Sequence, residues 1–356
     1  MYMIIYFLFL LIIFFILKKK KIYYSCNPMK LNIHIKNLFS DLNYVYTPYE
    51  NWDIYLPYSY TFLENELNII KKSNKKRIID GINNCDIICG KDYLCNFLIK
   101  NYGRIITDTI IPKTYVIKNN SDIYKFIKDY SDKDIYLLKN NIQKKKGITF
   151  YNNKNEILKN KNNYKIIQKY VNNQIIIMDR RLSLRIYVLL IFKNNKKDVY
   201  ISKYGKCLYS NLLTDKKNTN FEELIANTYP ISDIYKKYPL NYQNLKKIFG
   251  KKNFNKLDNN IIRILILIFS KALKHLGNNK NFKNDICYQL FGADFILTDK
   301  YYPYLLEINK GPELSSINLN DFNLKKKIIL DIFEKIGLFK YNTQENSFLK
   351  IISSNS

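Results

Sequence analysis

Two neighbouring strand-like segments near the carboxyl end restrict the fold of this chain more than any other feature. Segments 293–298 and 303–309 are rich in β-branched and aromatic residues, and the polar stretch DKYY separates them, as in a β-hairpin. Side chains alternate between the two faces of a strand. The apolar face of the hairpin is therefore expected to contain Phe295, Leu297, Leu306 and Ile308. These side chains suit a hydrophobic core.

The opposite face of the hairpin is expected to be polar. Glu307 and Asn309 lie two residues apart and share a face, and Asp294 points to the same side as Ile296 on the first strand. If the two polar faces coincide, three oxygen-bearing side chains converge at one end of the hairpin. Such oxygens are the ligands that Mg²⁺ prefers, usually together with phosphates. The alternative is a surface hairpin whose polar face is solvated.

The remaining sequence predicts a globular chain of the α/β (α+β) class. The 356 residues are 47% hydrophobic, which suits two or three lobes with extended cores. The runs IYLLK, KIIQKYV and LRIYVLLIF are expected to be strands. Asn259–Gly277 is expected to be a core helix, because its uninterrupted apolar run is too short to span a membrane. The Asn- and Lys-rich stretches 152–163, 193–198 and 214–220 are expected to be loops or insertions between strands.

The amino terminus resembles a membrane anchor. Tyr2 to Leu17 form an unbroken apolar run, and four lysines follow it at 18–21. The lysines come after the run and no small-residue cleavage site follows, so a single uncleaved transmembrane helix is expected rather than a signal peptide. The lysines would place the body of the protein in the cytoplasm. We therefore expect an anchor with its basic flank over residues 1–21 and a short tether over 22–30. A spurious upstream start codon is the alternative.

The charge and the cysteines bear on partners and compartment. The formal net charge is +28, which permits nucleic acid, an anionic membrane or an acidic protein as partner. The alternative is that the excess of lysine reflects an AT-rich gene and not a partner. No basic block with interleaved aromatics stands out, so nucleic acid is the less favoured alternative. The six cysteines form no CxxC pair, and His34 and His275 are the only histidines. Reduced thiols without a zinc site are therefore expected.

The hairpin segment resembles a known family. The stretch GADFILTDKYYPYLLEINKGPELS is similar to the closing motif of the tubulin-tyrosine-ligase-like proteins, a branch of the ATP-grasp enzymes. In that family an Asp and a later Glu-x-Asn hold the magnesium ions that bridge the ATP phosphates. The resemblance implies that Asp294, Glu307 and Asn309 are the metal ligands, with ATP and Mg²⁺ as cofactors.

Earlier segments match the same family. The stretch IIQKYVNNQIIIMDRRLSLRIYVLL resembles the strand that edges the adenine, followed by a strand with basic residues. Lys139, at the end of IYLLK, matches a strand lysine that contacts ATP phosphates, and GKDYL at 90–94 is similar to the amino-terminal lobe. The resemblance implies catalytic roles for Lys139 and Arg185. It also implies ATP contacts for Lys139, Gln168, Lys169, Tyr170 and Arg181.

The chain departs from the family pattern at several positions. The phosphate loop is glycine-poor, so Lys144, Lys145 and Lys146 would substitute charge for backbone donors before Gly147. Ser183 stands where the family has an acidic residue, and Lys206 is the cation nearest to an expected arginine. Of the family's His-Leu-Thr-Asn element only NTN remains, with Asn220. Ser183, Lys206 and Asn220 are therefore candidate contacts to the amino acid or the acceptor.

The resemblance covers roughly residues 80–340 and implies an ATP-grasp fold. The expected lobes are an amino-terminal lobe at 31–117, a central lobe at 118–182 and a carboxy-terminal lobe at 183–340, followed by a loosely held tail at 341–356. ATP would lie between the last two lobes. The implied reaction ligates a free amino acid to a protein through an acyl phosphate. The implied acceptor is the acidic tail of tubulin or of another protein, which a basic body suits. A degenerate member that binds nucleotide or tubulin without ligation is the alternative.

Overall fold

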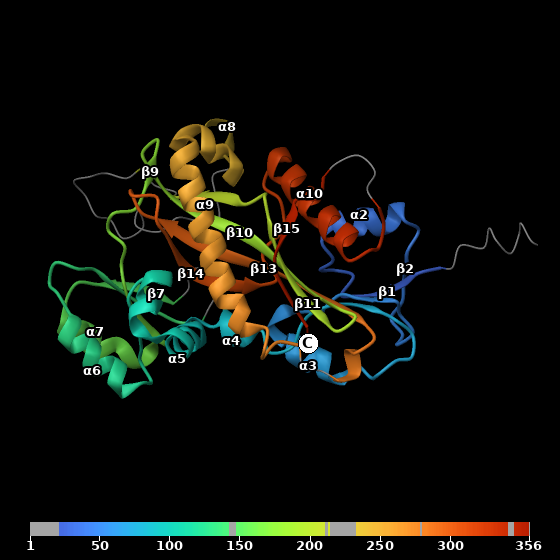
Figure 1. Cartoon of the computed structure of the whole chain (residues 1–356), viewed down its shortest axis with the longest axis horizontal. Helices are drawn as coiled ribbons and strands as arrows, with labels where there is room; N and C mark the ends of the chain where they lie inside the picture. The colour runs from blue at the N-terminus through green and yellow to red at the C-terminus, as the bar shows by residue number, and fades with distance from the viewer. Residues whose placement is uncertain are drawn as a thin grey trace, which may run out of the picture.

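The computed structural model describes residues 21–141, 147–210, 213, 233–277, 280–340 and 345–355. A large sheet with helices on both faces forms the body, and a small sheet with two helices forms a lobe beside it (Figure 1). The mixed α/β class predicted from the sequence is confirmed.

The large sheet has eleven strands and spans both ends of the chain. Its strands are β1 (Tyr23–Ser25), β2 (Val45–Tyr46), β3 (Ile54–Tyr55), β4 (Ile78–Asp80), β9 (Ile176–Ile177), β10 (Arg180–Lys193), β11 (Lys196–Ser202), β12 (Lys206–Tyr209), β13 (Ile286–Leu297), β14 (Pro303–Lys310) and β15 (Phe348–Asn355). The main order is β15-β11-β10-β13-β4-β3-β1-β2, and β14 pairs with β13. The strand β4 pairs with β13 in parallel orientation, so the amino-terminal strands and the carboxy-terminal hairpin share one sheet.

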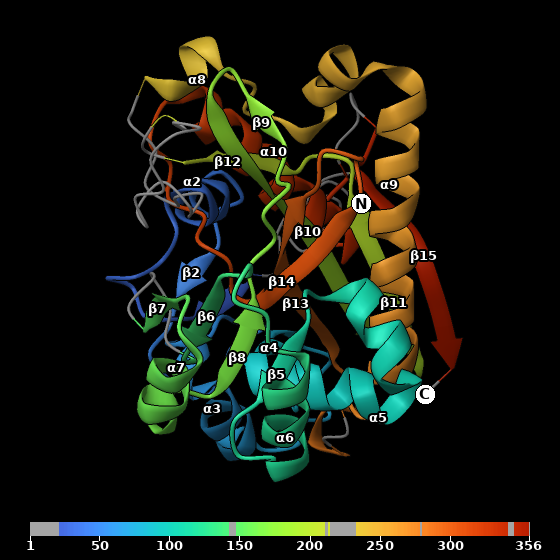
Figure 2. The same ribbon diagram turned by 90° about the vertical axis from the view of Figure 1, so that its left-hand side faces the viewer.

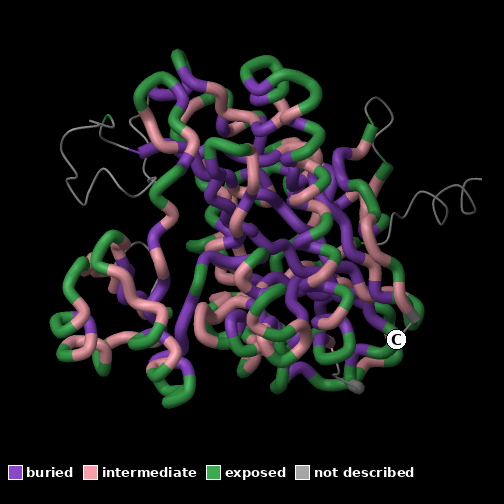
Figure 3. Tube along the Cα trace, turned by 60° about the vertical axis from the view of Figure 1, so that its left-hand side comes forward, coloured by how far each residue is buried: buried purple, intermediate pink, exposed green. Residues whose placement is uncertain are grey.

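Alternation along β10 divides the body into two cores. Leu184, Ile186 and Val188 belong to a core with helices α3 (Leu63–Ile69), α4 (Asp86–Cys89), α5 (Lys91–Ile110) and α9 (Leu245–Ala272). Tyr187, Leu189 and Ile191 belong to a core with helices α2 (Ile33–Asp41) and α10 (Leu319–Lys335). Burial on both sides explains why this strand is an apolar run rather than a simple alternation. Residues 186–191 of β10 are all buried, and Figure 3 shows that buried chain is concentrated in the interior of the body.

The small sheet forms the lobe that carries α6 (Asn120–Asp129) and α7 (Lys154–Asn160) (Figure 2). Its strands are β5 (Thr114–Val116), β6 (Tyr136–Lys139), β7 (Ile148–Tyr151) and β8 (Ile166–Lys169), in the order β5-β8-β6-β7. One core, which includes Phe126, Tyr136 and Ile157, joins the sheet to both helices. The strands expected from IYLLK and KIIQKYV are confirmed as β6 and β8.

The stretches expected to be loops or insertions have different outcomes. The stretch 152–163 holds α7, because the Asn153 side chain caps the helix and Ile157 is buried. The stretch 193–198 is a tight hairpin turn, with positive φ at Asn194 and Asn195. Residues 214–220 lie outside the described residues.

The two segments expected to be loose also contribute strands. Within the expected tether 22–30, β1 pairs with β2 and β3, so this segment is part of the sheet. In the expected tail, β15 pairs along β11, and Phe348 inserts into the core beneath α10. Neither β1 nor β15 has a long apolar run, and the strands that they pair with are distant in the sequence. Pairing with distant strands therefore ordered segments whose local sequence resembled linkers.

The helix expected at Asn259–Gly277 is the carboxy-terminal part of α9. No helix within the described ranges combines the length and apolarity needed to cross a membrane. The anchor predicted over Tyr2 to Leu17, within residues 1–21, falls almost wholly outside those ranges and stays a prediction.

Candidate functional site

The polar faces of the two hairpin strands coincide, which is one of the two arrangements that the sequence allowed. In the β13–β14 register Asp294 lies opposite Glu307, and Gly292 lies opposite Asn309. The Asn309 side chain donates from Nδ2 to Asp294 Oδ2 at 3.3 Å and to Glu307 Oε1 at 3.1 Å. Three oxygen-bearing side chains therefore lie together on one face of the sheet.

The apolar face differs from the expectation at one residue. The register of β13 and β14 shifts between Asp294 and Phe295, as in a β-bulge, so Phe295 lies opposite Leu305. Leu305 and Ile308 are consequently buried, whereas Leu306 is only half-buried. The prediction of Leu306 as a core residue was wrong, because strict alternation does not allow for a bulge.

Arg185 is bound to Asp294. The two residues lie opposite each other on β10 and β13, and the guanidinium donates from Nε and Nη2 to the carboxylate at 2.8 and 2.7 Å. Burial raises the pKa of Asp294, and the charge of Arg185 only partly offsets the rise. Gly292 leaves room for this pair, because a Cβ there would lie 3.4 Å from Arg185 and 2.9 Å from Pro312. The strand arginine thus has the anionic partner that its burial requires.

Two lysines complete the charged cluster. Lys91 Nζ lies 2.9 Å from Glu307 Oε2. Lys139 is buried at the end of β6 and donates to Gln168 Oε1 at 2.6 Å, and Gln168 in turn donates to Thr114. Burial, together with the nearby charge of Lys91, lowers the pKa of Lys139 to about 8. We refer to Lys91, Lys139, Arg185, Asp294, Glu307 and Asn309 as the charged cluster.

Sequence reasoning did not single out Lys91. It is the first residue of α5, and its backbone N–H donates to Asn141 Oδ1 at 2.9 Å, which ties the helix to the segment after β6. The only available signal was the weak similarity of GKDYL at 90–94 to the family. Its partner Glu307 is more than half the chain away, so no local pattern could connect them.

The residues expected near the adenine lie along the edge of the small lobe. Gln168 holds Lys139, and the buried Tyr170 packs near Phe150. Burial raises the pKa of Tyr170 to about 12, and the nearby Arg181 opposes the rise, which places Arg181 close to this ring. Lys169 instead forms an ion pair with Asp134 at 2.7 Å.

Of the residues expected to form the end of the phosphate loop, Lys144 to Gly147, the structure describes only Gly147. Gly147 adopts φ 101°, in the region that favours glycine, and its carbonyl accepts from Asn140 N–H at 2.9 Å. Lys144, Lys145 and Lys146 lie outside the described residues, so their role stays a prediction.

The candidate amino-acid or acceptor contacts lie on the same sheet face as Arg185. Ser183 is buried two residues before it on β10, and Lys206 lies opposite it on β12. Lys206 is held by both oxygens of Asp321 at 3.0 Å, and Lys325 joins the same carboxylate at 2.9 Å. Burial, followed by the charge of Lys325, lowers the pKa of Lys206 to about 8. Asn220 lies beyond the described ranges.

The donor set fits magnesium rather than zinc. No group of three or more His, Cys, Asp or Glu side chains suited to a metal occurs in the part of the chain that the structure describes. The charged cluster offers two carboxylates and one amide. Asn309 presents its amide nitrogen to both carboxylates, and half a turn of the amide would present its oxygen instead. Such a set suits an oxygen-seeking cation that retains water or phosphate ligands.

A sequence model of the tubulin-tyrosine ligase family matches residues 70–346, which is most of the chain. The chain belongs to the tubulin-tyrosine ligase family. This family of ligases lies within the ATP-grasp superfamily, so the resemblance stated from the sequence motifs is confirmed. The match begins before Lys91 and contains all six members of the charged cluster.

Curated relatives of this family member are tubulin-modifying enzymes by name. A probable tubulin polyglutamylase of Caenorhabditis elegans is 22% identical over 300 residues, covering 76% of this chain and 70% of the relative. Tubulin glycylase 3C of Tetrahymena thermophila is 28% identical over 210 residues, covering 54% and 19%. A probable tubulin polyglutamylase of Homo sapiens is 23% identical over 324 residues, covering 81% and 50%. The chain thus spans half or less of the length of two of these three relatives.

Proposed function

We propose that this family member is an ATP- and Mg²⁺-dependent ligase that joins an amino acid to an acidic protein tail, with tubulin as the acceptor. The observation that carries the proposal is the convergence of Asp294, Glu307 and Asn309 with Arg185, Lys91 and Lys139. The names of the relatives support tubulin as the acceptor. A body with net charge +28 suits an acidic tail.

The charged cluster has the groups that phosphoryl transfer from ATP requires. Asp294, Glu307 and Asn309 would hold Mg²⁺, which supplies charge neutralisation at the phosphates when bound. If Asp294 binds Mg²⁺, Arg185 would lose its carboxylate partner. The guanidinium of Arg185 would then be available to a phosphate oxygen. Lys91 and Lys139 supply further donors to phosphates. Catalysis would then rest on positioning and electrostatics.

The proposed reaction has two steps. A carboxylate oxygen of the acceptor attacks the γ-phosphorus of ATP, and ADP leaves to give an acyl phosphate. The amino nitrogen of the incoming amino acid then attacks the acyl carbon, phosphate leaves, and the nitrogen loses a proton to water. Lys206 and Ser183, on the same sheet face as Arg185, are candidates to contact the amino acid or acceptor.

Incorporation of labelled amino acids tests this proposal. The purified full-length chain is incubated with ATP, Mg²⁺ and tubulin, and with labelled glutamate, glycine or tyrosine in separate reactions. We expect ATP-dependent labelling of tubulin by one of the three. Tubulin from which the acidic tails have been removed is the matched control and should remain unlabelled. Absence of label with all three amino acids contradicts ligation.

A second candidate function is nucleotide or tubulin binding without ligation. It is favoured by Ser183, which has no carboxylate, and by Lys206, which Asp321 already neutralises. Single-turnover release of ADP in the presence of tubulin distinguishes the two. Release that depends on the tubulin tail supports the ligase, whereas bound ATP that persists unchanged supports the second candidate.

A further inference from the structure

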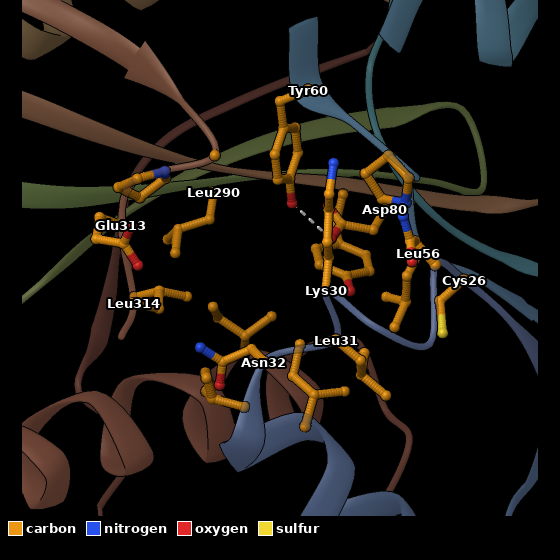
Figure 4. A pocket seen from close by; sticks show the side chains of 18 of the residues that line it. Cys26, Lys30, Leu31, Asn32, Leu56, Tyr60, Asp80, Leu290, Glu313 and Leu314 are labelled. Atoms are coloured by element: carbon orange, nitrogen blue, oxygen red, sulfur yellow. Dashed lines mark hydrogen bonds between the residues drawn. The ribbon is translucent and has the colours of Figure 1, made fainter. Parts of the chain in front are cut away.

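A cavity lies beneath α2 and α10, on the face of the large sheet that carries Arg185 and Asp294. Its volume is about 260 Å³, room for several water-sized groups. The wall includes the apolar residues Leu31, Leu56, Leu290 and Leu314, and Lys30, Asn32 and Glu313 are among its polar members (Figure 4). Pro312 packs on Gly292, between this cavity and Asp294 along β13. The cavity is therefore a neighbour of the charged cluster and not part of it.

A buried carboxylate faces this cavity. Asp80, the last residue of β4, lines the wall and is only 6% exposed. Its Oδ2 accepts from the Tyr60 hydroxyl at 2.8 Å, whereas its Oδ1 is buried without a hydrogen-bond partner. Figure 4 shows the Tyr60–Asp80 bond at the edge of the open space. A buried carboxylate oxygen without a donor is costly.

Asp80 differs in this respect from the other buried aspartates of the described chain. Asp122, Asp285, Asp294, Asp321 and Asp331 each form an ion pair with a lysine or arginine. Asp80 has no such pair within the described ranges, although the chain carries 58 basic residues. Burial accordingly raises the pKa of Asp80 to about 7, and the hydroxyls of Tyr60 and Tyr288 only partly oppose the rise. A cation delivered into the cavity would supply the missing partner.

We propose that this cavity binds a small primary amine, whose ammonium group donates to Asp80 Oδ1 and whose apolar body packs against Leu31, Leu56 and Leu290. An ammonium group has three donors and a positive charge, which are the two things that Asp80 lacks. An apolar wall with a few polar groups, among them Asp80, matches the usual composition of a small-ligand pocket. The inference is separate from the proposed ligase function, because that function places ATP at the charged cluster and the amino acid or acceptor beside Ser183 and Lys206.

The amine could belong to a free small molecule or to a lysine side chain of a partner protein. Both present the same ammonium group on an aliphatic chain. Hexylamine represents the free amine, and Nα-acetyl-lysine N-methylamide represents the side chain within a peptide. Hexanol has the same apolar body as hexylamine without the charge, and it measures the contribution of the apolar wall alone.

Calorimetry on the full-length chain at pH 8 tests the proposal with these probes. We expect hexylamine to bind at least tenfold more tightly than hexanol, and Asp80→Asn to remove that preference. The side-chain oxygen of the introduced asparagine can still accept from the Tyr60 hydroxyl, so the cavity wall keeps its shape while the negative charge of Asp80 is lost. Glu313→Gln is the matched control, because Glu313 also lines the cavity but its Oε1 already accepts from Ser315 N–H. That variant should bind hexylamine within threefold of the parent chain.

A second variant covers the case in which Asp80→Asn fails to fold. Tyr60→Phe removes the donor to Asp80 Oδ2 and keeps the charge of the carboxylate, so hexylamine binding should persist and the preference over hexanol should not fall. Binding of the blocked lysine as well as hexylamine supports a partner side chain, and binding of hexylamine alone supports a free amine. Equal binding of hexylamine and hexanol, or no binding of either amine, overturns the proposal.

Discussion

Glu307 is ionised at a lower pH than an ordinary glutamate. Burial alone would raise its pKa, but Lys91, Asn309 and Lys139 outweigh burial and bring the pKa from 4.5 to about 2. The ionised form therefore stabilises the folded chain above about pH 4.5, and this contribution is lost as the pH falls towards 2. Two adjacent carboxylates by themselves would repel each other. Lys91 and Lys139 turn this unfavourable environment into a favourable one for the ionised Glu307. The sequence around Glu307 does not reveal these two lysines.

The first prediction concerns Glu307→Gln. The change should abolish Mg·ATP-dependent turnover and lower the free energy of unfolding at pH 7 by roughly 1–3 kcal/mol, because Lys91 loses its partner. The loss of stability should shrink as the pH is lowered to about 3. Denaturant unfolding at both pH values measures the second effect. Glu345→Gln is the control, since that ion pair with Lys203 is exposed and contributes little. A variant that keeps turnover would remove Glu307 from the site.

The second prediction concerns Lys91→Met. The methionine keeps most of the side-chain length and removes the charge, so ATP should bind at least tenfold more weakly if Lys91 contacts phosphate. Titration with a fluorescent ATP analogue measures the affinity. Lys100→Met is the matched control, because Lys100 lies on the same helix but is exposed. Equal affinities for both variants would limit Lys91 to neutralising Glu307.

Among the elements, strands with β-branched and aromatic runs were predictable and those formed by distant partners were not. The strands β6, β8, β10, β13 and β14 follow from β-branched and aromatic runs. Alternation places Glu307 and Asn309 on one face, but the position of Asp294 beside them depends on the register of the two strands. The helix α7 was hidden by asparagine-rich composition, and its start depends on the Asn153 cap. The bulge beside Asp294 and the pairing of β15 with β11 are set by tertiary contacts. Such contacts leave no periodic signal in one strand.

The third prediction tests whether β15 is an integral strand. Phe348 is 2% exposed and packs in the core beneath α10, whereas Leu349 is 44% exposed on the opposite face. Phe348→Ala should lower the free energy of unfolding by roughly 3–5 kcal/mol, because it removes a fully buried ring. Leu349→Ala, one residue along the same strand, should cost less than about 1 kcal/mol. Similar small losses for both variants would mean that the end of the chain is only loosely attached.

At the scale of the whole molecule, the charged cluster is assembled from three regions. Lys91 begins α5, Lys139 ends a strand of the small sheet, and Asp294 with Glu307 belongs to the large sheet. Relative movement of the small lobe would therefore separate Lys139 from Glu307. ATP held by both sides should oppose that movement, which is the arrangement expected of a nucleotide bound between two lobes.

The fourth prediction concerns the anchor. We expect residues 2–17 to hold the full-length chain on a membrane, with the lysines at 18–21 on the cytoplasmic side. Carbonate extraction of cell membranes should leave the tagged full-length chain in the pellet. A truncation that begins at Ile22 keeps all of β1 and should move to the supernatant. Equal extraction of both forms would argue against the anchor.

The last prediction concerns the net charge of +28 and rests on the proposed acceptor. Attraction between a basic body and an acidic tail weakens as salt screens it, so the KM for tubulin should rise several-fold between about 50 and 200 mM salt. The kcat should change much less, because the charged cluster is largely buried and screened less by salt. Duplex DNA, added as a competing polyanion, distinguishes recruitment of an acidic tail from nucleic-acid binding. If DNA binds with a steep salt dependence and the KM for tubulin does not change with salt concentration, the positive charge binds nucleic acid instead. If DNA competes weakly and the KM follows salt, the charge recruits the acidic tail to the sheet face that carries Arg185.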